Sequence, residues 1–408
     1  MRIKRVGWRT AIAVAFAAPL ALSACTHGHA VSAAWKKPAP AKAVINLTPA
    51  GGATNQPVST EIGTGVTNGT LSSVKVTDAS GKTIDGAMRP DNSSWVPSQP
   101  LDYKTAYHAV VTATGPGGTK VSKSTDFTTM GDPGDNRIET GLYFQDGATY
   151  GVAMPVVIDF DTPIPDSAKA AVEKRLFVQS NPPQVGVWHW FGDNHVEYRP
   201  QNYWKTGTKI TVRAALGGLP VGDRFLDEDR GGTATIGGKM AFQVDNATKS
   251  MKVYQNDRLV QTFPVSLGQS NTPTSSGNMV LMTHERTSLF DVPGEYRVTV
   301  DFAEKFTDDG QYLHAAPWSV GDQGSDNVSH GCVNLSEDAA GWVFNNSQIG
   351  DPVTVTGTEV HVDPGDGWTV WDMNWADYVK GSALPHPELQ GQAGAQAGKD
   401  ATTAPRTN

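Results

Sequence analysis

The stretch Ser329-His330-Gly331-Cys332-Val333-Asn334 places a cysteine directly after a histidine and a glycine. A free thiol has a pKa near ~8.5, so a nucleophilic cysteine needs a neighbouring base or positive charge to favour the thiolate. His330 is adjacent in sequence, and His314 lies upstream in Tyr312-Leu313-His314. Gly331 allows a sharp turn that could aim the N–H groups of His330, Gly331 and Cys332 at one oxyanion. The stretch therefore favours a nucleophilic cysteine.

Two other interpretations of this cluster stay open at this point. A lone cysteine is more often a small buried apolar residue than a nucleophile. His314, His330 and Cys332 could also bind a catalytic zinc ion with water as the fourth ligand, although the chain has no HExxH or CxxC spacing to support this. We expect neither a metal nor another cofactor.

The spacing of these residues resembles the signature of a known family. His314, fourteen residues and then Ser329-His330-Gly331-Cys332-Val333-Asn334 are similar to the active site of the L,D-transpeptidases of peptidoglycan synthesis. The loop Thr272-Pro273-Thr274 resembles their characteristic turn. The chain up to about Lys380 resembles the long mycobacterial type. The resemblance implies a β-sandwich-like catalytic domain at 248–357, with a lid over the site.

The resemblance also implies a reaction. Cys332 would attack a tetrapeptide stem, expel the terminal D-alanine and pass the acyl group to the side-chain amine of a second stem, which gives a 3→3 cross-link. His314 would be the general base, oriented by the backbone carbonyl of Ala315. His330 and Gly331 would belong to the oxyanion hole. Carbapenems would acylate the same thiol. The alternatives are an L,D-carboxypeptidase with the same acyl-enzyme and a non-catalytic lipoprotein that binds the cell wall.

Further residues would contact or shape the substrate pocket by the same resemblance. Ser329 and Asn334 would shape it. Substrate contacts would come from Tyr296, Asp309, Gly310 and Trp318. The stretch from Met282 to Asp301 is shorter than the family's lid and differs from it in composition.

Upstream of this domain, the sequence contains two similar β modules. Short alternating runs separated by Gly, Asn and Asp turns predict an immunoglobulin-like sandwich at 44–130 and a second at 131–247. Trp95, Pro97, Leu101, Thr105, Tyr107 and Ala109 lie 103 residues before Tyr198, Pro200, Trp204, Thr208, Ile210 and Val212. Phe127 would match Phe242, which implies a 12-residue insertion near Gly222–Gly232. We expect both modules to act as a spacer.

Acidic residues gather in the predicted insertion, at Asp223, Asp227, Glu228 and Asp229. Clustered carboxylates can bind calcium, but their spacing here matches no EF-hand loop. A solvated acidic loop is the favoured interpretation.

The C-terminal region contains an aromatic pattern followed by a polar tail. Trp368, Trp371, Trp375 and Tyr378 step by 3, 4 and 3 residues, which predicts one face of a short helix. We expect this stripe to pack a C-terminal subdomain, 358–380, on the second sandwich. The tail 381–408 contains no aromatic residue and is predicted to be disordered.

The first 24 residues have the pattern of a signal peptide. A basic start precedes the apolar run Ala11–Leu22, and the run ends at Leu22-Ser23-Ala24-Cys25. This end resembles a bacterial lipobox, which implies that Cys25 carries lipid and that 25–43 is a tether. The protein would then be anchored to the outer face of the plasma membrane, in the cell envelope.

The overall composition fits this organisation. The 408 residues contain 43 glycines, 26 prolines and two cysteines, with a formal charge of −8. An acidic chain argues against a nucleic-acid binder, and two cysteines are too few for a disulfide scaffold. The predicted fold class is mainly β: two immunoglobulin-like β-sandwich domains, then the catalytic β domain, then a short C-terminal helical extension.

Overall fold

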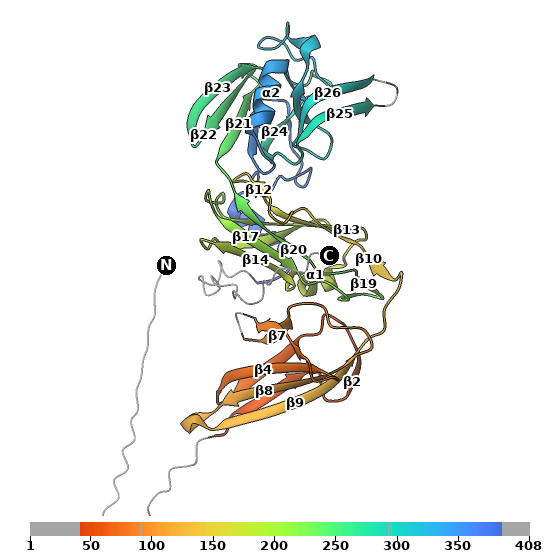
Figure 1. Cartoon of the computed structure of the whole chain (residues 1–408). Coiled ribbons are helices and arrows are strands. Elements are labelled where there is room, and N and C mark those ends of the chain that lie inside the picture. Colours follow the sequence, from red (N-terminus) through yellow and green to blue (C-terminus); the bar gives the residue numbers. More distant parts are fainter. Residues whose placement is uncertain (1–40, 90–91, 293, 295, 386–408) are drawn as a thin grey trace, which may run out of the picture. The chain divides into compact units, whose positions relative to one another are not determined.

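The computed structural model describes residues 41–385, except 90, 91, 293 and 295. Strands dominate this part of the chain (Figure 1), and the predicted fold class is confirmed. The predicted signal peptide, the lipidated Cys25, most of the tether and the tail from residue 386 lie outside the described residues. Among the described residues, no helix has both the length and the apolar character needed to span a membrane.

The first domain is a sandwich of two sheets. One sheet has the order β1-β3-β7-β6 and contains β1 (Val44–Thr48), β3 (Ile62–Thr67), β7 (Ser94–Pro97) and β6 (Gly86–Met88). The other has the order β2-β9-β8-β4-β5 and contains β2 (Ala53–Gln56), β9 (Lys120–Thr129), β8 (Ala106–Thr114), β4 (Thr70–Asp78) and β5 (Thr83–Ile84). Alternate residues of β8 are buried, with Tyr107, Ala109 and Val111 in the core. This period of two is why the alternating runs predicted strands.

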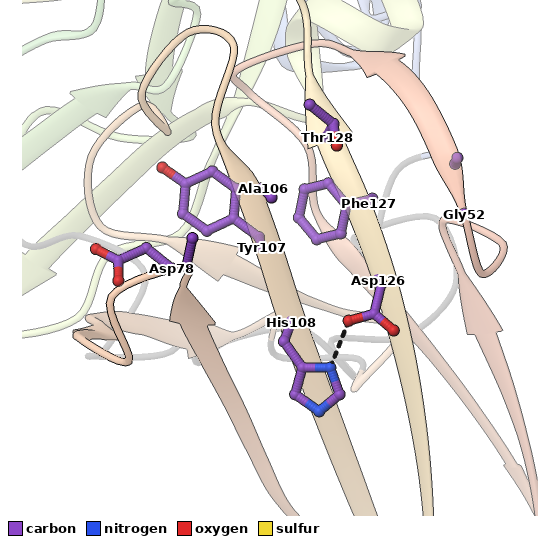
Figure 2. Close-up of a pocket in the computed structure, with 10 residues that line it drawn as sticks. Gly52, Asp78, Ala106, Tyr107, His108, Asp126, Phe127 and Thr128 are labelled. Atoms are coloured by element: carbon purple, nitrogen blue, oxygen red, sulfur yellow. Dashed lines mark hydrogen bonds and ion pairs between the residues drawn. The ribbon is translucent and has the colours of Figure 1, made fainter.

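A small surface pocket of about 210 Å³ lies on this domain. Figure 2 shows His108 on β8 beside Asp126 on β9, with their ring nitrogen and carboxylate 2.6 Å apart. Both side chains are largely exposed, so the pair contributes little to stability. The role of this domain as a spacer stays a prediction.

The second domain is also a two-sheet sandwich. One sheet has the order β11-β13-β16-β15 and contains β11 (Thr140–Leu142), β13 (Val156–Phe160), β16 (His195–Pro200) and β15 (Gly186–Phe191). The other has the order β12-β20-β17-β14 and contains β12 (Thr149–Tyr150), β20 (Arg230–Ile236), β17 (Lys209–Ala214) and β14 (Leu176–Asn181). Helix α1 (Asp166–Glu173) connects β13 to β14.

The predicted repeat is partly correct. Tyr107 and Ile210 lie on equivalent strands, β8 and β17, each paired with the last strand of its own sandwich. Tyr107 faces Phe127, and Ile210 faces Ala234. Ala234 is therefore the counterpart of Phe127, and the predicted match to Phe242, with its 12-residue insertion, is wrong.

The acidic loop is paired rather than simply solvated. Asp229 lies 2.9 Å from Arg213, and the two side chains are 6% and 2% exposed. Asp227 lies 2.5 Å from Arg230. The loop also contributes β18 (Pro220–Val221) and β19 (Arg224–Leu226) to a small sheet with β10 (Arg137–Ile138). Two of these carboxylates are therefore paired with arginine side chains, where the calcium interpretation required a bound metal ion.

The third domain is built from two sheets and one helix. Its larger sheet has the order β23-β22-β21-β29-β24-β30 and contains β23 (Arg258–Pro264), β22 (Ser250–Gln255), β21 (Met240–Asp245), β29 (Pro352–Thr356), β24 (Ser275–Val280) and β30 (Val360–His361). The smaller has the order β25-β26-β27-β28 and contains β25 (Glu285–Val292), β26 (Tyr296–Lys305), β27 (Tyr312–Ala315) and β28 (Val333–Leu335). Since β21 pairs with β22 and β29, the predicted boundary at 247 falls one strand too late.

Helix α2 (Glu337–Asn346) follows the cysteine motif. The run Ser336-Glu337-Asp338 predicts a helix start at this place, and the structure confirms it. The Ser336 side chain accepts a hydrogen bond from the Ala339 N–H at 3.2 Å, so it caps the helix. Ala339, Ala340 and Val343 are buried in the core of the third domain. This packing fixes the chain directly after β28.

The C-terminal segment packs on the second sandwich, as predicted. Trp371 donates its indole hydrogen bond to the Ala153 carbonyl at 2.6 Å, and the Tyr378 hydroxyl donates to the Glu197 carbonyl at 2.7 Å. Within 368–378 the α-helix α3 covers only Trp375–Tyr378. The prediction of one helix face for all four rings is therefore wrong, although the packing it implied is correct.

Candidate active site

Two short parallel strands bring the sequence motifs together. β27 and β28 pair in parallel, with Leu313 opposite Val333 and His314 opposite Asn334. The intervening loop contains the 3₁₀ turn η2 (Pro317–Ser319). Because adjacent strands lie about 4.8 Å apart, this register holds His314 beside the segment that contains Cys332.

A cavity of about 370 Å³ opens beside these strands. The hairpin of β25 and β26 projects from the third domain (Figure 1). The cavity walls combine the predicted site residues with apolar side chains from this hairpin: Phe290, Val298, Val300, His314, Trp318, Val328, Ser329, His330, Cys332 and Asn334. The hairpin occupies the position of the predicted lid. The Phe290 ring lies edge-on to the His314 ring, with centroids 5.3 Å apart.

His314 is buried and has a defined orientation. Its Nδ1 lies 2.8 Å from the Ala315 carbonyl oxygen, which requires a hydrogen on Nδ1 and leaves Nε2 as the acceptor. Burial lowers the pKa of His314 to about 4, and the hydrogen bond to Ala315 opposes this shift. At neutral pH the imidazole is therefore uncharged and able to accept a proton at Nε2.

Cys332 is buried and protonated. Burial raises the pKa of its thiol to about 12, against the effect of a hydrogen bond from the Tyr312 backbone N–H. The thiol lies 3.8 Å from the Gly310 carbonyl oxygen, to which it donates. The resting pair is thus a neutral thiol and a neutral imidazole, so a nucleophilic role for the sulfur would require the thiol proton to move.

The turn before Cys332 is held by Ser329. The Ser329 hydroxyl donates to the Cys332 carbonyl at 2.6 Å and accepts from the Gly331 N–H at 3.1 Å. Gly331 has φ +123°, a conformation that favours glycine. In this structure the Gly331 N–H therefore donates to a side chain, whereas the oxyanion-hole prediction assigns it to a substrate oxygen. His330 is exposed and lines the cavity.

Asn334 also lines the cavity, and its side chain is held by a hydrogen bond. Its amide donates to the Ser319 hydroxyl at 3.2 Å, and Ser319 in turn donates to the Ala316 carbonyl. Thr272, from the predicted turn, donates to the Ser329 carbonyl at 3.3 Å. Ser329 and Asn334 both line the cavity, and their role in shaping the substrate pocket stays a prediction.

The predicted substrate contacts fall in different places. Trp318 is 59% exposed and its ring centroid lies 6.2 Å from that of His314, at the cavity wall. Gly310 contacts the thiol through its carbonyl, whereas Asp309 is exposed and does not line the cavity. Tyr296 begins β26, and its side chain lies outside the described part.

Sequence reasoning missed the apolar lid residues Phe290, Val298 and Val300. The alternation of Val298 and Val300 was a usable signal, since every second residue of a strand faces the same side. In the part of the chain that the structure describes, no three His, Cys, Asp or Glu side chains converge to hold a metal ion. His314, His330 and Cys332 thus do not form the set that the zinc alternative requires.

Comparisons with known proteins match the third domain to one family model and a region that spans both sandwiches to another. A family model described as "L,D-transpeptidase catalytic domain" matches residues 239–355, and one described as "Bacterial Ig domain" matches residues 53–220. L,D-transpeptidase 5 of Mycobacterium tuberculosis is 33% identical over 93% of this chain and 85% of its own length. L,D-transpeptidase 2 of the same species is 30% identical over 92% of this chain and 97% of its own length. The solved structure of LdtMt1 in complex with imipenem is 32% identical, with a TM-score of 0.45 over 53% of this chain and 97% of its own.

Proposed function

Because the chain belongs to the L,D-transpeptidase family, we propose that it forms 3→3 peptidoglycan cross-links through an acyl-enzyme on Cys332. The donor is a tetrapeptide stem, and the acceptor is the side-chain amine of a second stem. The observation that supports this most is that one cavity is lined both by a neutral His314, whose Nε2 is free of the bond to Ala315, and by Cys332.

The first half-reaction breaks the amide bond to the terminal D-alanine. The Cys332 sulfur attacks the stem carbonyl while the thiol proton passes to Nε2 of His314, so a C–S bond forms as the S–H bond breaks. His314 then donates this proton to the departing nitrogen, the C–N bond breaks and D-alanine leaves. The product is a thioester, which conserves the energy of the amide, so no ATP is required.

In the second half-reaction the acceptor amine is the nucleophile and the Cys332 sulfur is the leaving group. The acceptor amine attacks the thioester carbonyl and loses a proton to His314, and that proton returns to sulfur as the C–S bond breaks. The oxyanion of each tetrahedral intermediate would be stabilised by the backbone N–H groups of His330 and Cys332. The Gly331 N–H could join them only after exchanging its bond to Ser329.

The apolar lid is suited to favour transfer over hydrolysis. Phe290, Val298 and Val300 contribute to the cavity wall, so a bound stem would displace water from the thioester. Carbapenems would acylate the same thiol, because their strained lactam presents a carbonyl to the same nucleophile. The protein would work at the outer face of the plasma membrane, with lipid on Cys25 and the two sandwiches as a spacer.

Analysis of products by mass spectrometry tests this function. The purified protein is incubated with a disaccharide tetrapeptide in the presence of a metal chelator. A cross-linked dimer supports transpeptidation, and a tripeptide stem alone supports the L,D-carboxypeptidase. If neither product forms, the wall-binding alternative is favoured.

A further inference from the structure

The loop between β26 and β27 touches the nucleophile. Its residue Gly310 accepts a hydrogen bond from the Cys332 thiol at a sulfur-to-oxygen distance of 3.8 Å. The loop turns tightly, because the Gly310 N–H donates to the Thr307 carbonyl at 3.2 Å and Gly310 has φ +92°. Any change in this turn therefore moves a group that contacts the reacting sulfur.

The C-terminal subdomain forms hydrogen bonds with this loop. The Asp309 N–H donates to Oδ1 of Asp366 at 2.8 Å, and the Gly367 N–H donates to Oδ2 of Asp308 at 3.2 Å. A Cβ on Gly367 would come within 3.1 Å of the Thr307 Cα, so glycine permits close approach there. Two hydrogen bonds and one close backbone contact thus join segments that lie 57–60 residues apart.

The segment that binds this loop, residues 363–369, is itself held in place. The Gly365 N–H donates to the Thr369 hydroxyl at 2.7 Å, and the Asp366 N–H donates to the Asp363 carbonyl at 3.0 Å. Trp368 is 4% exposed and packs in the core cluster of the second sandwich. Asp366 is therefore presented to the loop from a rigid support.

We propose that Asp366 is a positioning residue for the reaction: by accepting the Asp309 N–H, it holds the turn that keeps the Gly310 carbonyl on the Cys332 thiol. The proposal rests on the proposed function, because it assigns Asp366 to the same thiol. It gives the C-terminal subdomain a part in catalysis beyond packing. Asp366 acts through Gly310 and touches no reacting atom, so its effect must appear in the behaviour of the thiol.

The test compares three variants in the full chain. Asp366→Ala removes the acceptor, while Asp366→Asn keeps an oxygen that can accept the Asp309 N–H. Asp363→Asn is the matched control, since Asp363 lies in the same loop and is exposed. Two rates are measured for each protein: acylation by a carbapenem, followed by intact mass, and alkylation by iodoacetamide as a function of pH.

A positioning role predicts opposite changes in the two rates. In Asp366→Ala the loop relaxes and water reaches the thiol, so the pKa of Cys332 falls from about 12 towards its ordinary value. Alkylation at pH 8 should rise at least tenfold, while carbapenem acylation should fall at least tenfold. Asp366→Asn and Asp363→Asn should stay within about threefold of wild type in both rates.

Three results would overturn the proposal. Equal rates in Asp366→Ala and wild type would do so, as would an Asp366→Asn variant as impaired as Asp366→Ala. If Asp366→Ala does not fold, amide hydrogen exchange in wild type decides, because fast exchange at Asp309 contradicts a held loop. A wild-type protein that no carbapenem acylates contradicts the proposed function instead, so the two failures are distinguishable.

Discussion

The imidazole of His314 donates from Nδ1 to the carbonyl oxygen of Ala315, 2.8 Å away, so its Nε2 is the basic nitrogen. This bond uses the main chain of the next residue and needs no particular side chain there. It sets the tautomer on which general-base catalysis depends. His314 carries no charge at neutral pH, because burial lowers its pKa to about 4.

Replacement of His314 and of Ala315 should have unequal effects. His314→Ala removes the proposed base and should lower the acylation rate by about 10²–10⁴-fold, the usual contribution of a positioned general base. Ala315→Ser leaves the carbonyl in place and should stay within about threefold of wild type. Carbapenem acylation followed by intact mass measures both. A large loss in Ala315→Ser would show that the orientation does not depend on the backbone alone.

The thiol of Cys332 and the imidazole of His314 should titrate at widely separated pH values. Because the pKa of His314 is about 4 and that of Cys332 is about 12, acylation should rise through pH 4 as the imidazole loses its proton. It should then stay flat to pH 9. Iodoacetamide alkylation should rise about tenfold per pH unit from 7 to 9, since it follows the thiolate fraction. An alkylation plateau near pH 8 would contradict the buried thiol.

A buried carboxyl near the base of the lid predicts a stabilising substitution. Burial, with a smaller contribution from the charge of Glu304, raises the pKa of Asp351 to about 8. In the unfolded chain the same carboxyl loses its proton near pH 4, whereas the folded protein keeps it to about pH 8. The free energy of unfolding therefore falls as pH rises from about 4 to 8. Among the described residues, Oδ1 of Asp351 has no hydrogen-bond partner.

Asp351→Asn should therefore raise the melting temperature at pH 8 and have a smaller effect at pH 5. The shift should be about 2–4 °C for each kcal/mol in a domain of this size. Thermal unfolding at the two pH values measures it, with the exposed Asp326→Asn as control. An equal shift at both values would mean that ionisation of Asp351 is not the cause.

Docking of the C-terminal segment should depend on Arg199. Its guanidinium lies 4.2 Å from the Tyr378 ring centroid and 4.6 Å from that of Trp371, and it donates to the Met373 carbonyl at 2.9 Å. Buried cation–π contacts contribute up to about 2 kcal/mol each. Arg199→Ala should make the segment from 371 to 385 sensitive to limited proteolysis. The exposed Arg258→Ala is the control, and equal protection in both variants would argue against this role.

Features with local signals were predictable from the sequence. The Ser336 cap predicted the start of α2, because capping involves residues three apart in the chain. The period of two in β8 and β17 predicted both sandwiches. The spacing of the motif also predicted that His314 and Cys332 share a site, and both residues line the same cavity. The aromatic stripe predicted packing correctly because large apolar surfaces must be buried.

Features that depend on distant pairing were not predictable in this way. Phe242 looked like the end of the second sandwich, but β21 pairs in parallel with β29, more than a hundred residues later. The capture of the Gly331 N–H by Ser329 depends on a side-chain rotamer, which residue spacing does not specify. The contact between Asp309 and Asp366 requires the whole C-terminal subdomain to be in place.

The most direct test of the central claim is the intact mass of the protein after incubation with a disaccharide tetrapeptide, wild type beside Cys332→Ala. The proposed mechanism predicts an adduct on wild type whose added mass equals that of the donor minus D-alanine. Cys332→Ala, with an unchanged melting temperature, should give neither adduct nor dimer. An adduct or a cross-linked dimer formed by Cys332→Ala, or a wild-type protein that forms neither, would contradict acyl transfer through Cys332.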